Sequence, residues 1–247
     1  MGDVAMLDAP EGFVPATKVV SNEELIRELD DGLLEPHRDR RQHPFVNAVA
    51  AGTATIDQIA GWRHQICHWA HPTNRRFGFI YSRCTDDDLS LMMFENMAEE
   101  EHGASSGAGG HIALNYRFLD ELGWDEEKRA KDFPKLETWA LRHWFEVVFT
   151  NRPVVESIGS LSFAAERLNP HVLGRIYQGL KEHYDISEEG LASLAVHASH
   201  VEEEHGSLGP LAFERHAQTV AGQNGVRAAV WHTAELYYSM YNVWQYY

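Results

Sequence analysis

Residues 99–103 read Glu99-Glu100-Glu101-His102-Gly103, and residues 202–206 repeat the phrase as Glu202-Glu203-Glu204-His205-Gly206. Each copy contains Glu-x-x-His, and on a helix positions i and i+3 share one face, so a carboxylate and an imidazole can bind one ion. A single copy is typical of a solvated acidic helix face, but the second copy favours a metal site. Helical bundles build di-iron and di-manganese sites from two such motifs plus further carboxylates.

The composition indicates a globular protein of the cytoplasm. The chain has 247 residues and a formal net charge of −16, which argues against nucleic acid and an anionic membrane surface as partners. No segment has the roughly eighteen consecutive apolar residues of a membrane span, and the first residues show no signal-peptide pattern. Two cysteines, Cys67 and Cys84, fit a reducing compartment without a disulfide framework.

Helical periodicity recurs along the chain without the alternation typical of strands. Ser21 and Thr55 are expected to cap helices, and His43-Pro44-Phe45 to begin another. Pro72 is expected to bend or end the helix that follows Thr55. We therefore predict an all-α protein with an irregular N-terminal segment, residues 1–20, and one helical domain, residues 21–247.

The two acidic phrases fall at the ends of expected helices. The first helix ends at His102, and a glycine- and serine-rich interruption over 105–110 precedes a helix that begins at His111. The second helix is expected over 188–205. Between them, Glu166 lies in an otherwise apolar run and needs a partner, because an unpaired charge in an apolar interior is costly. An ion pair with a nearby arginine, Arg167 or Arg175, and metal ligation are the alternatives, and we favour metal.

Six phrases occur in the order found in the heme-oxygenase-like helical superfamily: His43-Pro44-Phe45, Gln58-Ile59-Ala60-Gly61-Trp62, Glu95-Asn96-Met97, Phe118-Leu119-Asp120-Glu121-Leu122-Gly123, His183-Tyr184 and Glu204-His205-Gly206. Over residues 40–245 the chain resembles the branch of that superfamily that holds pyrroloquinoline quinone synthase and the non-heme di-iron oxidases. The resemblance implies a single-domain, heme-oxygenase-like helical bundle and, by analogy, a homodimer.

The resemblance also implies a ligand set for two Fe(II) ions per chain, with manganese as the alternative metal. The ligands that match the family's pattern are Glu99 or Glu100, His102 or His111, Glu166, Glu202 and His205. His102 satisfies the strict Glu-x-x-His spacing, whereas His111 has the family's position just before the next helix. The family's further histidine would stand at Ala198, and a one-residue π-bulge could bring His197 to that place.

The function that the resemblance implies is O₂-dependent oxidation of a small amine, amino acid or fatty-acid-like metabolite, by N-oxygenation or oxidative C–C cleavage. His183 and Tyr184 match a pocket pair of the quinone synthase branch. His64 and His68 share one helical side and are assigned to the same substrate pocket, although satisfied core histidines would show the same pattern. The rival functions are a cofactor-free oxidase resembling the quinone synthase, a thiaminase-like hydrolase with a reactive cysteine, and a non-catalytic helical binding protein.

Overall fold

A computed structural model describes residues 9–104, 107, 109–198 and 208–247, and these form helices and connections with no strand. The elements are α1 (Asn22–Leu33), a 3₁₀ turn (Arg40–Gln42), α2 (Pro44–Ala50), α3 (Ile56–Arg83), α4 (Asp87–His102), α5 (His111–Glu121), α6 (Glu126–Arg129), α7 (Leu136–Asn151), α8 (Val154–Ile158), a π-helix (Gly159–Glu166), α9 (Asn169–His183), α10 (Ala192–His197), α12 (Leu208–His216), α13 (Val220–Tyr241) and a closing 3₁₀ turn (Asn242–Tyr246). The all-α prediction is confirmed.

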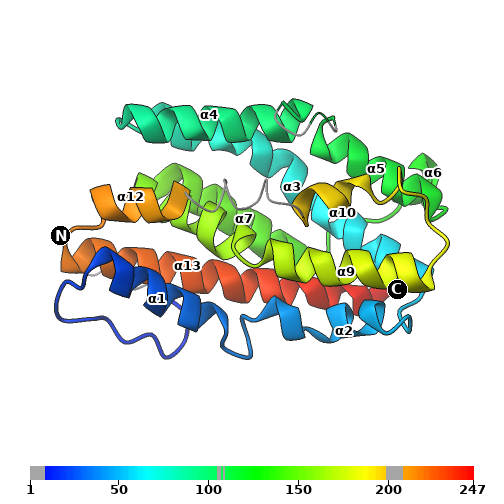
Figure 1. The fold of residues 1–247 in the computed structure, drawn as a ribbon, viewed down its shortest axis with the longest axis horizontal. Coiled ribbons are helices and arrows are strands. Elements are labelled where there is room, and N and C mark those ends of the chain that lie inside the picture. The colour runs from blue at the N-terminus through cyan, green and yellow to red at the C-terminus, as the bar shows by residue number, and fades with distance from the viewer. Residues whose placement is uncertain (1–8, 105–106, 108, 199–207) are drawn as a thin grey trace.

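In Figure 1, α7 and α13 cross the middle of the view, and α3 runs obliquely toward α4. In the same view α4 lies along one side of the bundle, and α1 and α2 lie along the opposite side. One cluster of buried side chains joins the helices, and its fully buried aromatic centre includes Phe45, Trp62 and Tyr241. Their rings pack at centroid distances of 4.8 Å (Phe45–Trp62) and 5.4 Å (Trp62–Tyr241), so the phrases around His43 and Trp62 meet the last helix in the core.

The helix starts follow the capping residues of the sequence. Ser21 accepts a hydrogen bond from the amide of Glu24 and begins α1, and Thr55 forms a reciprocal capping box with Gln58 at the start of α3. His43 caps α2, whose first residue is proline. Pro72 does not end its helix: α3 continues through it to Arg83.

The second half of the bundle differs from the sequence expectation in two places. The late helix begins at Ala192 rather than at residue 188, because residues 188–191 form a turn in which Ser187 accepts a hydrogen bond from the amide of Gly190. A π-helix that the sequence did not predict lies at Gly159–Glu166, and the π-bulge suggested between His197 and His205 would fall largely in residues 199–207, outside the described residues. Within the described residues, α10 keeps ordinary helical bonds to its end, where the amide of Ala198 donates to Leu194.

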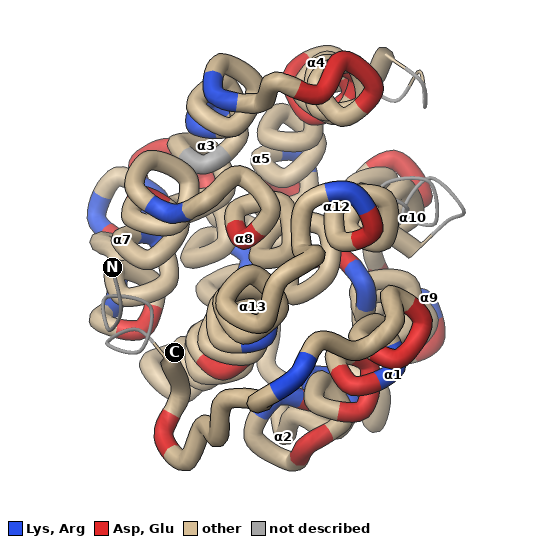
Figure 2. Tube along the Cα trace, turned by 90° about the vertical axis from the view of Figure 1, so that its left-hand side faces the viewer, with Lys and Arg blue, Asp and Glu red and all other residues tan. Residues whose placement is uncertain are grey.

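Residues 9–20 are irregular and lie along α13. Ala16 exchanges two hydrogen bonds with the side chain of Asn224, and the ring of Phe13 packs against Trp231. Acidic and basic residues are distributed over many helices, with acidic segments on α1, α4 and α9 in the end view (Figure 2). Among the described residues, no helix combines the length and apolar character needed to cross a membrane.

Candidate metal centre

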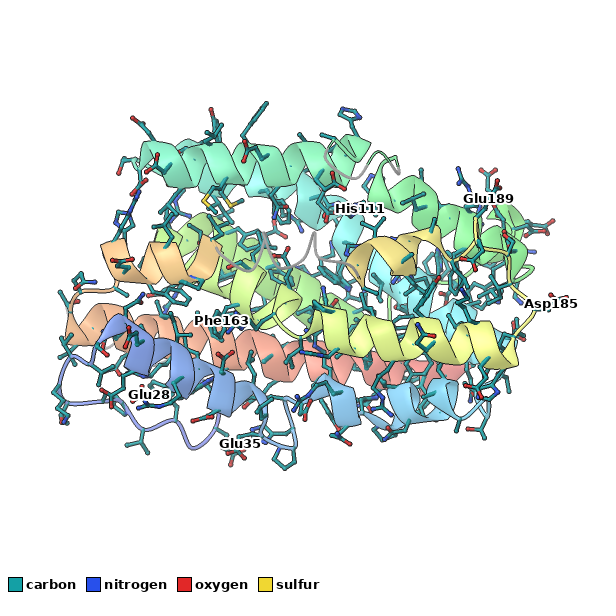
Figure 3. The ribbon with its side chains drawn as sticks, viewed as in Figure 1. Glu28, Glu35, His111, Phe163, Asp185 and Glu189 are labelled. Carbon is teal, nitrogen blue, oxygen red and sulfur yellow. The ribbon has the colours of Figure 1, made fainter. Side chains whose placement is uncertain are left out.

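The centre is built around His111, the first residue of α5, whose ring lies between two carboxylates from the end of α4. Its Nδ1 is 3.0 Å from Glu100 Oε1, and its Nε2 is 3.2 Å from Glu99 Oε1. His111 and Glu99 are both buried, and Figure 3 shows His111 in the interior where α4 and α5 meet. Burial would lower the pKa of His111, but the two carboxylates raise it to about 9. The carboxylates therefore favour a positive charge between them.

The turn between α4 and α5 brings these groups together because it is rich in glycine. Gly103 ends α4 in the left-handed conformation, with φ of 64°. A Cβ on Gly103 would lie 2.5 Å from the backbone nitrogen of Gly109, and a Cβ on Gly110 would lie 2.4 Å from the carbonyl oxygen of Glu101. Only glycine permits this close return of the chain, which places His111 against the last turn of α4.

The π-helix ends at Glu166, whose side chain is buried and lines the same cavity as Glu100 and His111. The cavity has a volume of about 70 Å³. Arg40, itself buried, donates to the carbonyl oxygens of Ala164 and Ala165, at 3.3 and 2.7 Å, and so binds backbone acceptors of this irregular helix. π-helical segments are frequent at functional sites because they re-aim side chains.

The two arginines that could have paired with Glu166 are engaged elsewhere. Arg167 forms a two-pronged ion pair with Asp30, at 2.9 and 2.8 Å. Arg175 donates to the carbonyl oxygen of Arg41 and to Asn47. The ion-pair alternative therefore finds no support among these contacts, and metal ligation by Glu166 stays a prediction.

His197, the last residue of α10, completes the described part of the centre. Its ring packs edge-on against His111 with the centroids 4.6 Å apart. One ligand atom from each of Glu100, His111 and His197 lies within 4.8 Å of the others. Carboxylate oxygens with imidazole nitrogens are the donor set that suits iron or manganese. The residues therefore fit a divalent transition metal.

The other predicted ligands lie elsewhere or outside the described residues. His102 is exposed at the end of α4, so the structure brings His111 rather than His102 to the carboxylates. Both Glu99 and Glu100 contact His111, so the choice between them stays open. Glu202 and His205 lie in residues 199–207, outside the part of the chain that the structure describes.

His64 and His68 belong to a different cluster, on another face of α3. His64 Nδ1 is 2.8 Å from Asp132 Oδ2, and His68 Nε2 is 2.9 Å from the carbonyl oxygen of Asp132. Burial would raise the pKa of Asp132, but hydrogen bonds from His64, Lys135, Tyr247 and Gln65 lower it well below its usual range. Burial, followed by the charge of His64, lowers the pKa of His68.

A cavity of about 250 Å³ borders this cluster, and its walls include His64, Cys67, His68 and Arg142. None of these residues lines the cavity at His111. The assignment of His64 and His68 to a substrate pocket thus concerns a cavity other than the one with the carboxylates. Within the described residues, one ligand atom from each of His64, His68 and Asp132 also lies within 4.8 Å of the others. Asp132, however, already forms an ion pair with Lys135 at 2.9 Å.

His183 and Tyr184 do not reach either cavity. Tyr184 donates to the carbonyl oxygen of Ala54 at 2.7 Å, and His183 Nε2 is 3.2 Å from the carbonyl oxygen of Ala50. Both residues therefore hold the end of α9 to the connection between α2 and α3. These contacts are structural, and a substrate role for the pair stays a prediction.

Four polar residues that line the cavity were not predicted from the sequence: Arg63, Asn74, Asn115 and Asn169. Asn74 donates to Glu100 Oε2 at 2.8 Å and orients that carboxylate. Arg63 donates to Asn115 Oδ1 and to Ser193 Oγ, and all but Ser193 line the cavity. The available signal was Arg63 itself, a charged residue on a helix face whose neighbours one turn away are Ile59 and Ile66.

Comparison with known proteins places these features in a family. A family model described as an iron-containing redox enzyme matches residues 60–238. A pyrroloquinoline-quinone synthase from Ruegeria pomeroyi is 24% identical over 154 residues, which are 62% of this chain and 62% of that protein. The match therefore spans less than two thirds of that relative's length.

Solved structures share the fold. A TenA homologue from Pseudomonas syringae pv. tomato has a TM-score of 0.74 and 12% identity, covering 95% of this chain and all of that one (100%). A domain of unknown function with a heme oxygenase-like fold, from Shewanella denitrificans, has a TM-score of 0.70 and 15% identity, covering 91% and 90%. At these identities the likeness establishes the heme-oxygenase-like fold alone, as the sequence phrases predicted.

Proposed function

The chain belongs to the iron-containing redox enzyme family, and on that premise we propose that it is an O₂-dependent non-heme di-iron oxidase or oxygenase. The observation that carries the proposal is the convergence of Glu100, His111, Glu166 and His197 at one cavity, with Glu99 in contact with His111. Glu202 and His205 would complete the set. The substrate would be a small amine, amino acid or fatty-acid-like metabolite, undergoing N-oxygenation or oxidative C–C cleavage.

In this proposal iron, when bound, supplies the electrons for the reduction of O₂. The chain orients the ligands and excludes water from the cavity. Asn74 fixes one carboxylate oxygen of Glu100, so that the other faces His111. The apolar walls, including Trp69 and Leu161, limit the access of water and strengthen electrostatic interactions in the cavity.

Anaerobic loading with Fe(II) tests the proposal. We expect about two irons per chain, as in other helical-bundle carboxylate sites, and an O₂-dependent change in absorbance on mixing with air-saturated buffer. Replacement of Glu202 or His205 by alanine is expected to remove tight binding of at least one iron, whereas Glu203→Ala is expected to retain both. Wild-type protein that binds no iron would overturn the proposal.

A second candidate function is a quinone-synthase-like oxidation in which histidines act without a metal. The 24% identity to the Ruegeria pomeroyi synthase favours it, and iron content separates it from the first. The hydrolase alternative finds less support, because Cys67 is buried and burial raises the pKa of its thiol to about 12. A neutral thiol is a poor nucleophile. A non-catalytic binding protein would show neither iron nor reaction with O₂.

A further inference from the structure

A buried arginine in the cavity wall has hydrogen-bonding capacity that the described protein does not use. Arg63, on α3, is 2% exposed. Its Nη2 donates to two neutral acceptors, Asn115 Oδ1 and Ser193 Oγ. Among the described residues its Nε has no hydrogen-bond partner, and no carboxylate forms an ion pair with the guanidinium. A guanidinium carries five N–H donors and remains charged at neutral pH. The guanidinium of Arg63 lies 5.6 Å from the ring centroid of Trp62, but within the described residues its charge has no carboxylate partner and its Nε donor is unused.

Arg40, a second buried arginine, differs from Arg63 in the partners of its guanidinium. Arg40 is also buried, yet its guanidinium donates to three acceptors and lies 3.9 Å from the ring centroid of Tyr237. Arg40 does not line the cavity, whereas Arg63 does. A buried charge without a paired opposite charge is costly, and it persists where a ligand provides the missing partner.

We infer that Arg63 is a recognition residue for the carboxylate of a small organic acid that binds in the cavity beside the Glu100–His111–His197 cluster. The inference rests on the proposed function, since it assigns a substrate class to the same site. Arginine binds carboxylates through paired N–H donors, and such pairs are stronger than neutral hydrogen bonds. Burial is the largest influence on the pKa of Arg63 and lowers it, whereas the charge of Glu100 has a smaller, opposing effect.

The remaining walls define the rest of the ligand. They include the apolar side chains of Ile66, Trp69, Phe77, Leu161 and Leu173. The cavity of about 70 Å³ has room for roughly five to seven waters, at roughly 10–15 Å³ each. An acid with a short hydrocarbon chain fits this space, with its carboxylate at Arg63 and its chain among the apolar side chains.

Hexanoate, its uncharged amide hexanamide, and hexylamine are matched probes. Ligand-observed NMR titration is carried out on the metal-free protein and on protein loaded with Mn(II). We expect wild-type protein to bind hexanoate at least about tenfold more tightly than hexanamide, a ratio that corresponds to about 1.4 kcal/mol, and hexylamine more weakly than either. Wild-type protein that binds hexanoate no more tightly than hexanamide overturns the inference without any variant.

Arg63→Gln is expected to abolish the preference while leaving the affinity for hexanamide within about twofold. Arg227→Gln is the matched control, because Arg227 is a buried arginine that pairs with Glu28 and does not line the cavity; it is expected to lower stability and to keep the preference. Arg63→Gln protein that still prefers hexanoate tenfold overturns the assignment. If Arg63→Gln does not fold, Arg63→Lys takes its place, because lysine keeps the charge but loses the paired donors. Arg63→Lys is expected to weaken the preference for hexanoate over hexanamide, and an unchanged ratio of the two affinities would refute the assignment of Arg63.

Metal analysis of the same samples separates this inference from the proposed function. Protein that takes up no iron or manganese, yet prefers hexanoate through Arg63, overturns the di-iron proposal and supports the carboxylate subsite. Protein that binds about two metal ions and shows no preference among the probes supports the di-iron proposal and overturns the subsite.

Discussion

Replacement of Gly103 by alanine is expected to damage the centre from a position that contributes no ligand. Gly103 has φ of 64°, and a left-handed conformation costs a non-glycine residue roughly 1–2 kcal/mol. The added Cβ would also lie 2.5 Å from the nitrogen and 2.7 Å from the oxygen of Gly109, both backbone atoms. Because neither can rotate away, the chain directly before His111 must move.

Gly123→Ala provides the control, because Gly123 has φ of 74° and no atom within 4 Å of an added Cβ. We expect Gly123→Ala to lower the free energy of unfolding by roughly 1–2 kcal/mol with unchanged Mn(II) affinity. Gly103→Ala is expected to lose that amount plus a further roughly 1–3 kcal/mol from the overlap. Its Mn(II) affinity is expected to fall at least about tenfold, or 1.4 kcal/mol, because His111 leaves its place between the carboxylates.

Urea unfolding of the metal-free proteins measures the first quantity, and titration with Mn(II) followed by electron paramagnetic resonance measures the second. Equal stability of the two variants, together with wild-type Mn(II) affinity in Gly103→Ala, would refute the view that the tight glycine turn positions His111.

Three further predictions concern the ligands, the Asp132 cluster and the metal. His111→Ala is expected to lower iron content, whereas His102→Ala, at an exposed position, is expected to change it little; equal iron content in both variants would contradict the assignment of His111. Asp132→Asn is expected to lower the free energy of unfolding by roughly 3 kcal/mol at pH 7. The folded-state pKa of Asp132 is depressed, so its contribution to stability is present above the unfolded pKa of roughly 4 and is lost as pH falls. The free energies of unfolding of the wild type and Asp132→Asn are therefore expected to converge in acid. A difference that does not change with pH would show that the charge of Asp132 is not its source. Mn(II) is expected to raise the melting temperature by several degrees, as about 2–3 kcal/mol would, and a calorimetric scan that is indifferent to the metal would count against the centre.

The fold was predictable because its signals are local. Ser21, Thr55 and Pro44 act within one turn of the helix that they begin, and the interruption before His111 is visible as glycine and serine. Local signals were ambiguous where they compete with packing. Pro72 was compatible with a helix end, yet α3 continues to Arg83, because packing along the whole bundle outweighs one lost backbone hydrogen bond.

The carboxylates of the centre were identified from sequence, but the spacing rule pointed equally to a histidine that the structure places at the surface. Glu99 is buried on α4, while His102, three residues on, is exposed at the point where the helix ends. The i, i+3 rule requires that both residues face the interior of the bundle. Here the chain turns back at Gly103, so the imidazole beside Glu99 comes from the next helix.

The histidines of α3 show why the cavity itself could not be read from residue types. The face with His64 and His68 carries the more conspicuous chemistry, yet it contacts Asp132 of the connection before α7. The face that meets the cavity offers Arg63 and Asn74 among apolar residues. Which face of a long buried helix borders a site depends on the helices packed against it, and these are brought there from distant parts of the sequence. A single charged residue on the otherwise apolar face therefore indicates the cavity better than the histidines do. A buried charge is costly unless a partner compensates it, whereas a neutral histidine needs only hydrogen bonds.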